Sequence, residues 1–293
     1  LLLLAWAYVK ADGFGNMLST PSQFGPGGAK EGQFWSVFVP QLTAMVGFWA
    51  TLALNMPDFT RYAATQDDQI KGQAIGLPPT MALFAFIGVA VTSATVVIYG
   101  GEPISDPVKL MGKMGGMSVI VALLALSVAT LTTNLAANVV APANGFANLN
   151  PEKISFKMGG YITAGLGIAI FPWKLLAGGA YVFTWLIGYS ALLGPIAGIL
   201  IADYFLVRRT ELDVDDLFRE DGQYSFSNGW NPIALLALVL AVLPNVPGFL
   251  KQVDLVENVP GIFTTIYSQA WFVGLFIAIL VYTPLMKKKL NQK

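Results

Sequence analysis

Residues Ala129 to Asn148 read ATLTTNLAANVVAPANGFAN, and this is the most informative run in the sequence. It carries no charged side chain and lies in the second half of an apolar segment that begins near Ser118. Polar side chains are costly inside a lipid bilayer, which offers them no hydrogen-bond partner. The stretch is therefore typical of a membrane-spanning helix whose polar groups bind a ligand or hold helices together. Before Pro142 these groups are Thr130, Thr132, Thr133, Asn134 and Asn138.

The polar groups of this stretch fall on two faces of the predicted helix. At about 100° per residue, Ala129, Thr132 and Thr133 lie within an arc of about 100°. Asn134 and Asn138 are four residues apart and share a different face. Hydroxyl and carbonyl oxygens suit a hard cation such as sodium, whereas an amide offers donors and an acceptor to the edge of a heterocycle. The alternative is that both faces only pack against other helices.

Composition indicates a polytopic membrane protein and disfavours an enzyme. The chain has 293 residues, of which 55% are hydrophobic and 12% charged, with a mean hydropathy of +0.62; soluble domains are about 25% charged. The formal net charge is zero, so nothing points to nucleic acid. With no cysteine and no histidine, the chain lacks disulfides, the usual zinc ligands and the commonest general base.

We predict an all-α polytopic membrane protein that forms a single transmembrane transporter domain over residues 1–293. Pro78 and Pro79 are expected near the first turn of the second span, where proline is tolerated. The chain opens on Leu1–Leu4 in an apolar run with neither a basic region nor a cleavage site, which predicts the end of a truncated helix. The apolar segments predict spans near 34–55, 74–99, 117–143, 158–172, 178–207, 230–249 and 267–286.

The distribution of basic residues predicts the orientation of these spans. Alternate loops divide the 17 Lys and Arg residues unequally, with eleven in one set and six in the other. Because the richer set is expected on the cytoplasmic side, the C-terminus is predicted to be cytoplasmic in a cell (plasma or inner) membrane.

Two further groups of residues are candidates for binding. Trp49 follows Gly47 and Phe48 deep in the first complete span, where its ring offers a flat face to an aromatic ligand. Tyr189 lies midway along the fifth span, beside Ser190, and lines a gate or packs against other helices.

Three motifs together resemble one family of transporters. Residues 47–61 (GFWATLALNMPDFTR) are similar to the end of the sixth helix of the nucleobase:cation symporter-1 family, which transports purines, pyrimidines, hydantoins and allantoin. Residues 132–144 (TTNLAANVVAPAN) resemble its eighth helix, and residues 202–209 (ADYFLVRR) resemble the end of its tenth. The motifs occur in the family's order, and with the spans around them they account for essentially the whole chain.

The resemblance implies an inverted-repeat fold of five plus five helices with two extra C-terminal helices. This chain would hold the tail of the fifth helix, the whole second repeat and the last two helices. The resemblance implies that the Ala129 carbonyl and the Thr132 and Thr133 hydroxyls form part of a sodium site. It further implies that Trp49 packs on the substrate ring and Asn138 hydrogen-bonds the ring's edge.

Phe48 and Tyr189 complete the candidate substrate residues. Relatives can have a small residue at the position of Phe48, so the size of the pocket is open. The implied function is a symporter that imports uracil, cytosine, allantoin, a hydantoin or a related cyclic amide or ureide. The coupling ion is sodium or a proton, with sodium favoured by the two hydroxyls; no other cofactor and no nucleic acid partner are expected, and the protein is expected to be a monomer. The alternatives are an amino-acid symporter of the same fold and a membrane sensor that does not transport.

Overall fold

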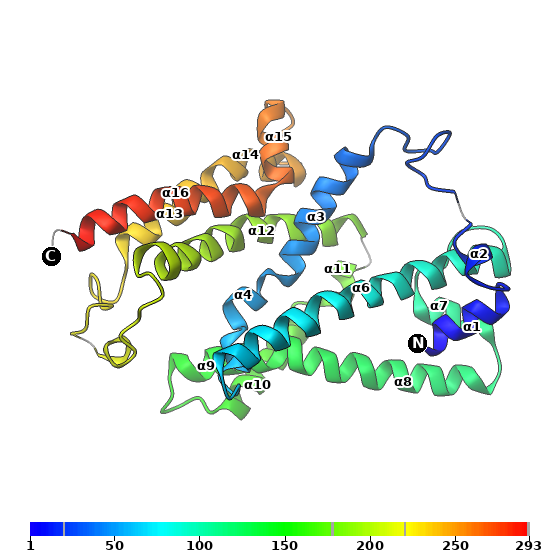
Figure 1. Cartoon of the computed structure of the whole chain (residues 1–293), viewed down its shortest axis with the longest axis horizontal. Helices are drawn as coiled ribbons and strands as arrows, with labels where there is room; N and C mark the ends of the chain where they lie inside the picture. The colour runs from blue at the N-terminus through cyan, green and yellow to red at the C-terminus, as the bar shows by residue number, and fades with distance from the viewer. Residues whose placement is uncertain (20, 177–178, 220, 292–293) are drawn as a thin grey trace. The chain divides into compact units, whose positions relative to one another are not determined.

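The computed structural model describes residues 1–19, 21–176, 179–219 and 221–291, and its regular elements there are helices (Figure 1). The chain divides into two compact units. Unit 1 comprises Leu1–Gly32 and Pro57–Ala169, and unit 2 comprises Gln33–Met56 and Ile170–Lys293.

Unit 1 contains the helix with the polar stretch. A π-helical segment, η1, joins α8 to α9, so that an apolar helix runs from Val119 to Leu149 over 31 residues. The elements of unit 1 are α1 (Leu2–Lys10), α2 (Phe14–Met17), α5 (Pro57–Thr60), α6 (Gln66–Tyr99), α7 (Pro107–Met114), α8 (Met117–Asn134), η1 (Leu135–Val139), α9 (Val140–Leu149) and α10 (Phe156–Ala169).

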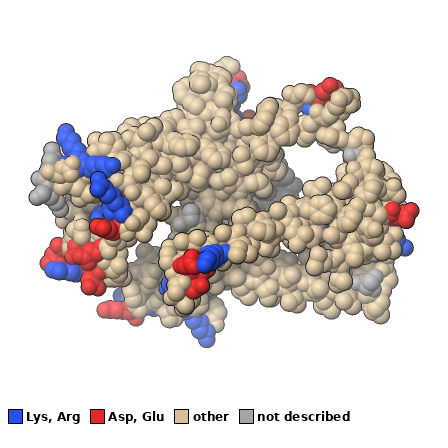
Figure 2. All heavy atoms as spheres, viewed as in Figure 1, with Lys and Arg blue, Asp and Glu red and all other residues tan. Residues whose placement is uncertain are grey.

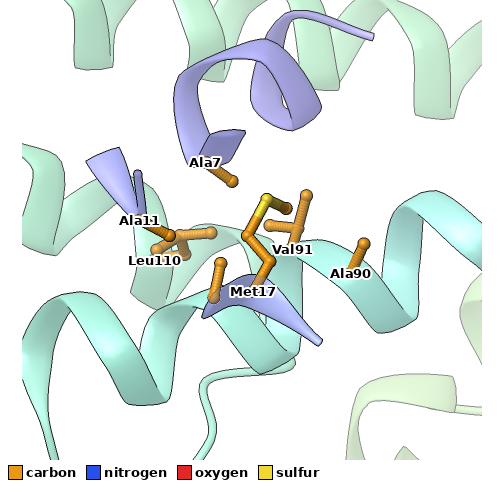
Figure 3. Packing of buried hydrophobic residues seen from close by; sticks show 7 residues of the cluster. Ala7, Ala11, Met17, Ala90, Val91 and Leu110 are labelled. Carbon is orange, nitrogen blue, oxygen red and sulfur yellow. The ribbon is translucent and has the colours of Figure 1, made fainter. Parts of the chain in front are cut away.

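The core of unit 1 forms around Met17, where α1, α2, α6 and α7 meet (Figure 3). Met17 is fully buried and four of the buried residues around it are alanines, which let the helix backbones approach closely. A flexible methionine fills the irregular space that remains. The surrounding buried residues are Ala7, Ala11, Ala90, Val91, Ala94 and Leu110.

Helix α6 begins earlier than the sequence predicts, at Gln66 instead of residue 74. Thr65 caps it by accepting a hydrogen bond from the Asp68 backbone N–H, and acidic side chains in the first turn suit the positive end of the helix dipole. Pro78 and Pro79 therefore lie inside a 34-residue helix, and their prediction near its first turn is wrong. The first residues of α6 are polar and precede the apolar segment from which the span was predicted, so the hydrophobic pattern did not indicate that they are helical.

Unit 2 is built around α12, which packs against α3, α13 and α16. Its elements are α3 (Phe34–Ala50), α4 (Leu52–Asn55), α11 (Pro172–Leu176), α12 (Gly179–Ile201), the π-helix η2 (Ala202–Val207), the 3₁₀-helix η3 (Asp215–Phe218), α13 (Pro232–Val242), the 3₁₀-helix η4 (Leu243–Asn245), α14 (Val246–Gln252), α15 (Gly261–Ser268) and α16 (Ala270–Leu290).

Glycines on α12 bring its backbone against α16. A Cβ atom at Gly194 would lie 2.2 Å from the Trp271 carbonyl oxygen, and one at Gly198 would lie 2.5 Å from that of Leu275. No larger residue fits these contacts without moving a helix. Small residues at such crossings are the usual way in which membrane helices associate.

Five helices in the described part of the chain are long and apolar enough to cross a membrane. They are Gln66–Tyr99, Val119–Leu149, Val182–Val207, Pro232–Gln252 and Ala270–Leu290, and Phe34–Ala50 is a shorter apolar helix. On the face shown in Figure 2, basic side chains gather where α16 ends, in agreement with the three lysines of its last turn.

Several helix ends differ from the predicted spans. The helix predicted to end at residue 143 continues to Leu149, because Pro142 lies in the first turn of α9, where a proline does not interrupt the helix. The predicted span 158–172 is a helix over Phe156–Ala169. Near its C-terminal end the span predicted over 230–249 changes to a 3₁₀ turn at Leu243–Asn245, which contains Pro244. Residues predicted as the start of the last span belong to the separate helix α15.

Candidate functional site

The polar stretch of unit 1 is interrupted by the π-helical segment Leu135–Val139, which contains Asn138. A π-helical turn adds a residue to the helix and shifts the side chains that follow it, and such turns are frequent at functional sites. The sequence predicts a continuous α-helix here, because no proline or glycine marks the change of hydrogen bonding. Thr132, Thr133 and Asn134 lie in the last turn of α8, before this segment, and Asn138 lies within it.

The candidate cation ligands lie on the last turns of α8. The Thr132 hydroxyl donates to the Val128 carbonyl oxygen at 2.9 Å and to the Ala129 carbonyl oxygen at 3.1 Å. The oxygens of Ala129 and Thr132 are therefore adjacent, and within the described residues the Thr132 hydroxyl acts only as a donor, which leaves its lone pairs for a cation. Thr133 is the next residue and is also exposed. Within the described residues, His, Cys, Asp and Glu form no group of three that would hold a metal.

Asn138 and Asn134 form a pair of amides across one helical turn. The Asn138 amide nitrogen donates to the Asn134 side-chain oxygen at 2.6 Å, and both residues are exposed. This bond leaves the Asn138 carbonyl oxygen as an acceptor and the Asn134 amide nitrogen as a donor. A cyclic amide or ureide carries the complementary N–H donor and C=O acceptor at its edge. The two asparagines therefore lie on one face, as predicted, and together they present one hydrogen-bond donor and one acceptor.

Asp58, in the first motif, is bound to the second motif within unit 1. Its carboxylate accepts a hydrogen bond from the Asn144 amide at 2.9 Å, which ties α5 to α9. The spacing of Asp58 and Arg61 allows an ion pair on a helix. In the structure, however, the Arg61 guanidinium lies 5.1 Å from the centre of the Tyr62 ring.

The aromatic candidates lie at the end of α3 in unit 2. The rings of Phe48 and Trp49 are 5.4 Å apart between centroids and nearly perpendicular at 84°. Both side chains are exposed, to 58% and 42% respectively. Helix α3 ends at Ala50 and the chain turns at Thr51 into α4. The Trp49 ring is thus available to stack on a flat ligand.

Gly47 sets the position of these rings by letting α3 lie directly on α12 (Figure 1). A Cβ atom at Gly47 would lie 1.9 Å from the Ser190 hydroxyl oxygen. That hydroxyl donates to the Leu186 carbonyl at 2.7 Å and to the Thr43 carbonyl at 3.2 Å, so it joins the two helices. Thr43 in turn donates to the Ser268 carbonyl at 2.7 Å. A buried set of polar contacts therefore fixes the crossing.

Tyr189 lies beside this crossing on α12. Its side chain is hydrogen-bonded with that of Thr51, at the turn that follows Trp49. Its ring also stacks on Trp185, with 6.4 Å between centroids and 13° between planes. Thr51 was not expected to contribute, since a threonine after a helix has no distinctive sequence signal.

The predicted site residues are divided between the two units. In unit 2 the structure brings Tyr189 to the Thr51 turn and joins Phe48 to Trp49. In unit 1 the Thr132 hydroxyl is hydrogen-bonded to the Ala129 carbonyl, and the Asn138 side chain is hydrogen-bonded to that of Asn134.

Comparison with known proteins shows the family. Residues 1–274 match the family described as permease for cytosine/purines, uracil, thiamine, allantoin. The chain is 49% identical over 290 residues to the purine-uracil permease NCS1 of Arabidopsis thaliana, covering 98% of this chain and 47% of that protein. It is 43% identical over 283 residues to the allantoin permease of Bacillus subtilis, covering 96% of this chain and 55% of that protein. The chain spans about half the length of these curated relatives.

A solved structure described as the inward facing conformation of Mhp1 is also similar. It matches with a TM-score of 0.67 and 27% identity, over 99% of this chain and 60% of that one. The match confirms the predicted all-α polytopic transporter fold. Together with the family match over residues 1–274, it shows that the chain belongs to the nucleobase:cation symporter-1 family of permeases.

Proposed function

We propose that the protein containing this chain is a secondary symporter that imports a nucleobase or a related cyclic amide or ureide together with sodium. Its relatives over nearly the whole chain are named purine-uracil and allantoin permeases. The observation that carries the proposal is the Asn134–Asn138 amide pair, set beside a π-helical turn in an otherwise apolar helix.

The proposed recognition uses hydrogen bonds and stacking, without bond chemistry. Asn138 accepts from a ring N–H, and Asn134 donates to the neighbouring carbonyl. Trp49 supplies the stacking surface, and Phe48 and Tyr189 limit the size of the ring. A site of this kind discriminates strongly against a molecule that lacks the matching N–H and C=O, because its own amides are then left unpaired.

The proposed sodium site uses the Ala129 carbonyl and the Thr132 and Thr133 hydroxyls. Neutral oxygens suit a monovalent hard cation. Sodium is transported with the substrate, and their binding is coupled reciprocally: if sodium tightens substrate binding, substrate tightens sodium binding by the same factor.

The first experiment measures uptake by the full-length protein in cells. Labelled uracil, cytosine, allantoin and a benzylated hydantoin are offered in sodium medium and in choline medium. Saturable, sodium-dependent uptake of one compound supports both parts of the proposal. Uptake that ignores sodium and collapses with the proton gradient removes the sodium assignment. Absence of uptake of all four, with the protein present in the membrane, contradicts the substrate assignment.

Asn138→Ala is expected to weaken substrate binding by about 100-fold, because it removes one hydrogen bond and leaves a polar group of the substrate unpaired. Protein abundance should not change, since the Asn138 side chain is exposed and bonds only to Asn134 within the described residues. Binding is measured by equilibrium titration with labelled substrate. Asn148→Ala, at an exposed asparagine near the end of α9, is the control. Equal affinities in the two variants would remove Asn138 from the site.

Thr133→Val is expected to raise the sodium concentration for half-maximal uptake by about tenfold, as losses of ligand support at metal sites commonly do. At saturating sodium the apparent affinity for substrate should change little. Thr130→Val tests a threonine of the same helix that lies outside the proposed ligand set. A matching shift in both variants would indicate a general effect of removing hydroxyls from α8.

A further inference from the structure

Unit 2 contains a cavity of about 390 Å³, and Tyr189, one of the proposed substrate residues, is among its lining residues. It lies between α12 and the segment from Val242 to Val253. Neither Phe48 nor Trp49 is among its lining residues. The side chains around it are mainly aliphatic and aromatic, and its size falls in the range of small-molecule sites, about 300–1,000 Å³. The lining residues used here are Trp185, Gly188, Leu192, Asn245, Val246 and Phe249.

Asn245 is a buried polar residue in this mainly apolar lining, which also includes Thr184 and Tyr189. Its side chain is buried, with 1% of its surface exposed. The amide nitrogen donates to the Ala241 carbonyl at 3.3 Å, but the side-chain oxygen has no hydrogen-bond partner within the described residues. A buried carbonyl without a donor is costly and calls for a ligand group that supplies one.

A second unpaired group stands at the wall of the same cavity. Tyr267 is 4% exposed, and its hydroxyl also lacks a partner in the described part of the chain. The hydroxyl lies 3.4 Å from the place that a Cβ atom at Gly188 would occupy, and Gly188 lines the cavity. Because Gly188 has no side chain, no side-chain atom of that residue separates the enclosed hydroxyl from the cavity.

The cavity is reached past apolar side chains. Trp185 is 60% exposed, Leu192 50% and Phe249 39%, and all three line it. They belong to helices long and apolar enough to cross a membrane. A ligand with an apolar body enters here from lipid without crossing a polar surface.

We propose that this cavity binds a lipid alcohol, a molecule with a large apolar body and a single hydroxyl group. The body fills the space between α12 and α14. The hydroxyl donates to the unpaired oxygen of Asn245, and the Tyr267 hydroxyl offers a second polar contact at the wall. A hydrocarbon leaves Asn245 unpaired, and a carboxylate brings a charge for which the lining has no cation.

The test uses full-length protein in lipid nanodiscs and three photoreactive probes: a diazirine-bearing hexadecanol, the matching alkane without the hydroxyl, and a diazirine-bearing sterol. Labelled peptides are identified by mass spectrometry. We expect the alcohol to label peptides of α12 and residues 242–253 several-fold more than the alkane does. Preference for the hexadecanol or for the sterol then identifies which kind of lipid alcohol fits.

The variant Asn245→Leu tests whether this residue binds the alcohol or only stabilises the fold. It should reduce labelling by the alcohol by about three- to tenfold, the effect of one hydrogen bond. Thermal stability should stay the same or rise, because the variant removes an unpaired buried oxygen. Tyr267→Phe, which keeps the ring, is the second variant and should also reduce labelling. Tyr204→Phe, at a tyrosine outside the cavity lining, should not.

Three results would overturn the proposal: equal labelling by alcohol and alkane, labelling confined to other helices, or undiminished labelling in the Asn245 and Tyr267 variants. None of them depends on transport, so the proposed symport stands or falls separately.

Discussion

Replacing Gly47 by alanine is expected to destabilise the protein by about 2–3 kcal/mol, as overpacking of a closed interface does. The new Cβ atom would lie 1.9 Å from the Ser190 hydroxyl oxygen and 2.7 Å from the Leu186 carbonyl oxygen. The hydroxyl can rotate only by giving up its bonds to Leu186 and Thr43, and the carbonyl belongs to the backbone of α12. Helices α3 and α12 must therefore separate.

The same change is expected to weaken substrate binding. Trp49 follows Gly47 by two residues, so a displaced α3 would move the proposed stacking surface away from Tyr189. Thermal unfolding of the purified full-length protein, followed by size-exclusion chromatography, measures the first effect, and substrate titration measures the second.

Two further variants make the prediction specific. Gly47→Ala combined with Ser190→Ala should recover only part of the loss, because the Leu186 carbonyl still lies 2.7 Å from the new atom. Gly72→Ala is the control, since a Cβ atom there has no neighbour within 4 Å and alanine favours a helix. If Gly47→Ala were as stable as Gly72→Ala, the close crossing of α3 and α12 would be wrong.

Replacing Asp203 by alanine is expected to cost about 3 kcal/mol or more of stability, because it leaves a buried charge without its partner. The Asp203 carboxylate accepts from the Arg208 guanidinium at 2.7 Å and from the Tyr282 hydroxyl at 2.8 Å. The side chain of Arg208 is only 7% exposed.

The Asp203 contacts also organise the start of α13. Tyr282 accepts a hydrogen bond from the Asn231 amide at 3.2 Å, and the Asn231 oxygen caps α13 by accepting from the Ile233 and Ala234 backbone. One carboxylate thus connects η2, α16 and the N-terminus of α13. Its loss is expected to loosen all three elements together, in a single transition at lower temperature.

The controls distinguish a buried pair from an exposed one. Lys71→Ala breaks the Asp67–Lys71 pair, whose side chains are 67% and 68% exposed, and should cost less than about 1 kcal/mol. Asp203→Ala combined with Arg208→Met should recover much of the stability, because no charge then remains buried. If Asp203→Ala and Lys71→Ala lowered the stability equally, the Asp203 contacts would contribute no more than an exposed ion pair.

The sequence by itself determined the class of fold, the family and the candidate site residues. Long apolar runs and few charges indicate a polytopic membrane protein, since lipid accepts apolar side chains and penalises polar ones. For the same reason the uncharged polar residues of the 129–138 stretch are conspicuous, and the motifs around Trp49, Asn138 and Asp203 identify the family. Helix ends were less predictable, as α6 shows: its first turns are polar, and only the Thr65 cap and the acidic first turn mark them.

Tertiary structure alone decided how these residues are joined. The π-helical turn at Leu135–Val139, the contact of Gly47 with Ser190 and the Tyr189–Thr51 bond depend on where backbones meet, which residue types do not encode locally. The same holds for the bond of Asp58 to Asn144, 86 residues away, and for the unpaired oxygen of Asn245. Hydropathy specifies which segments enter the membrane, because transfer energies add residue by residue, whereas hydrogen bonds between distant segments form only once the helices have packed.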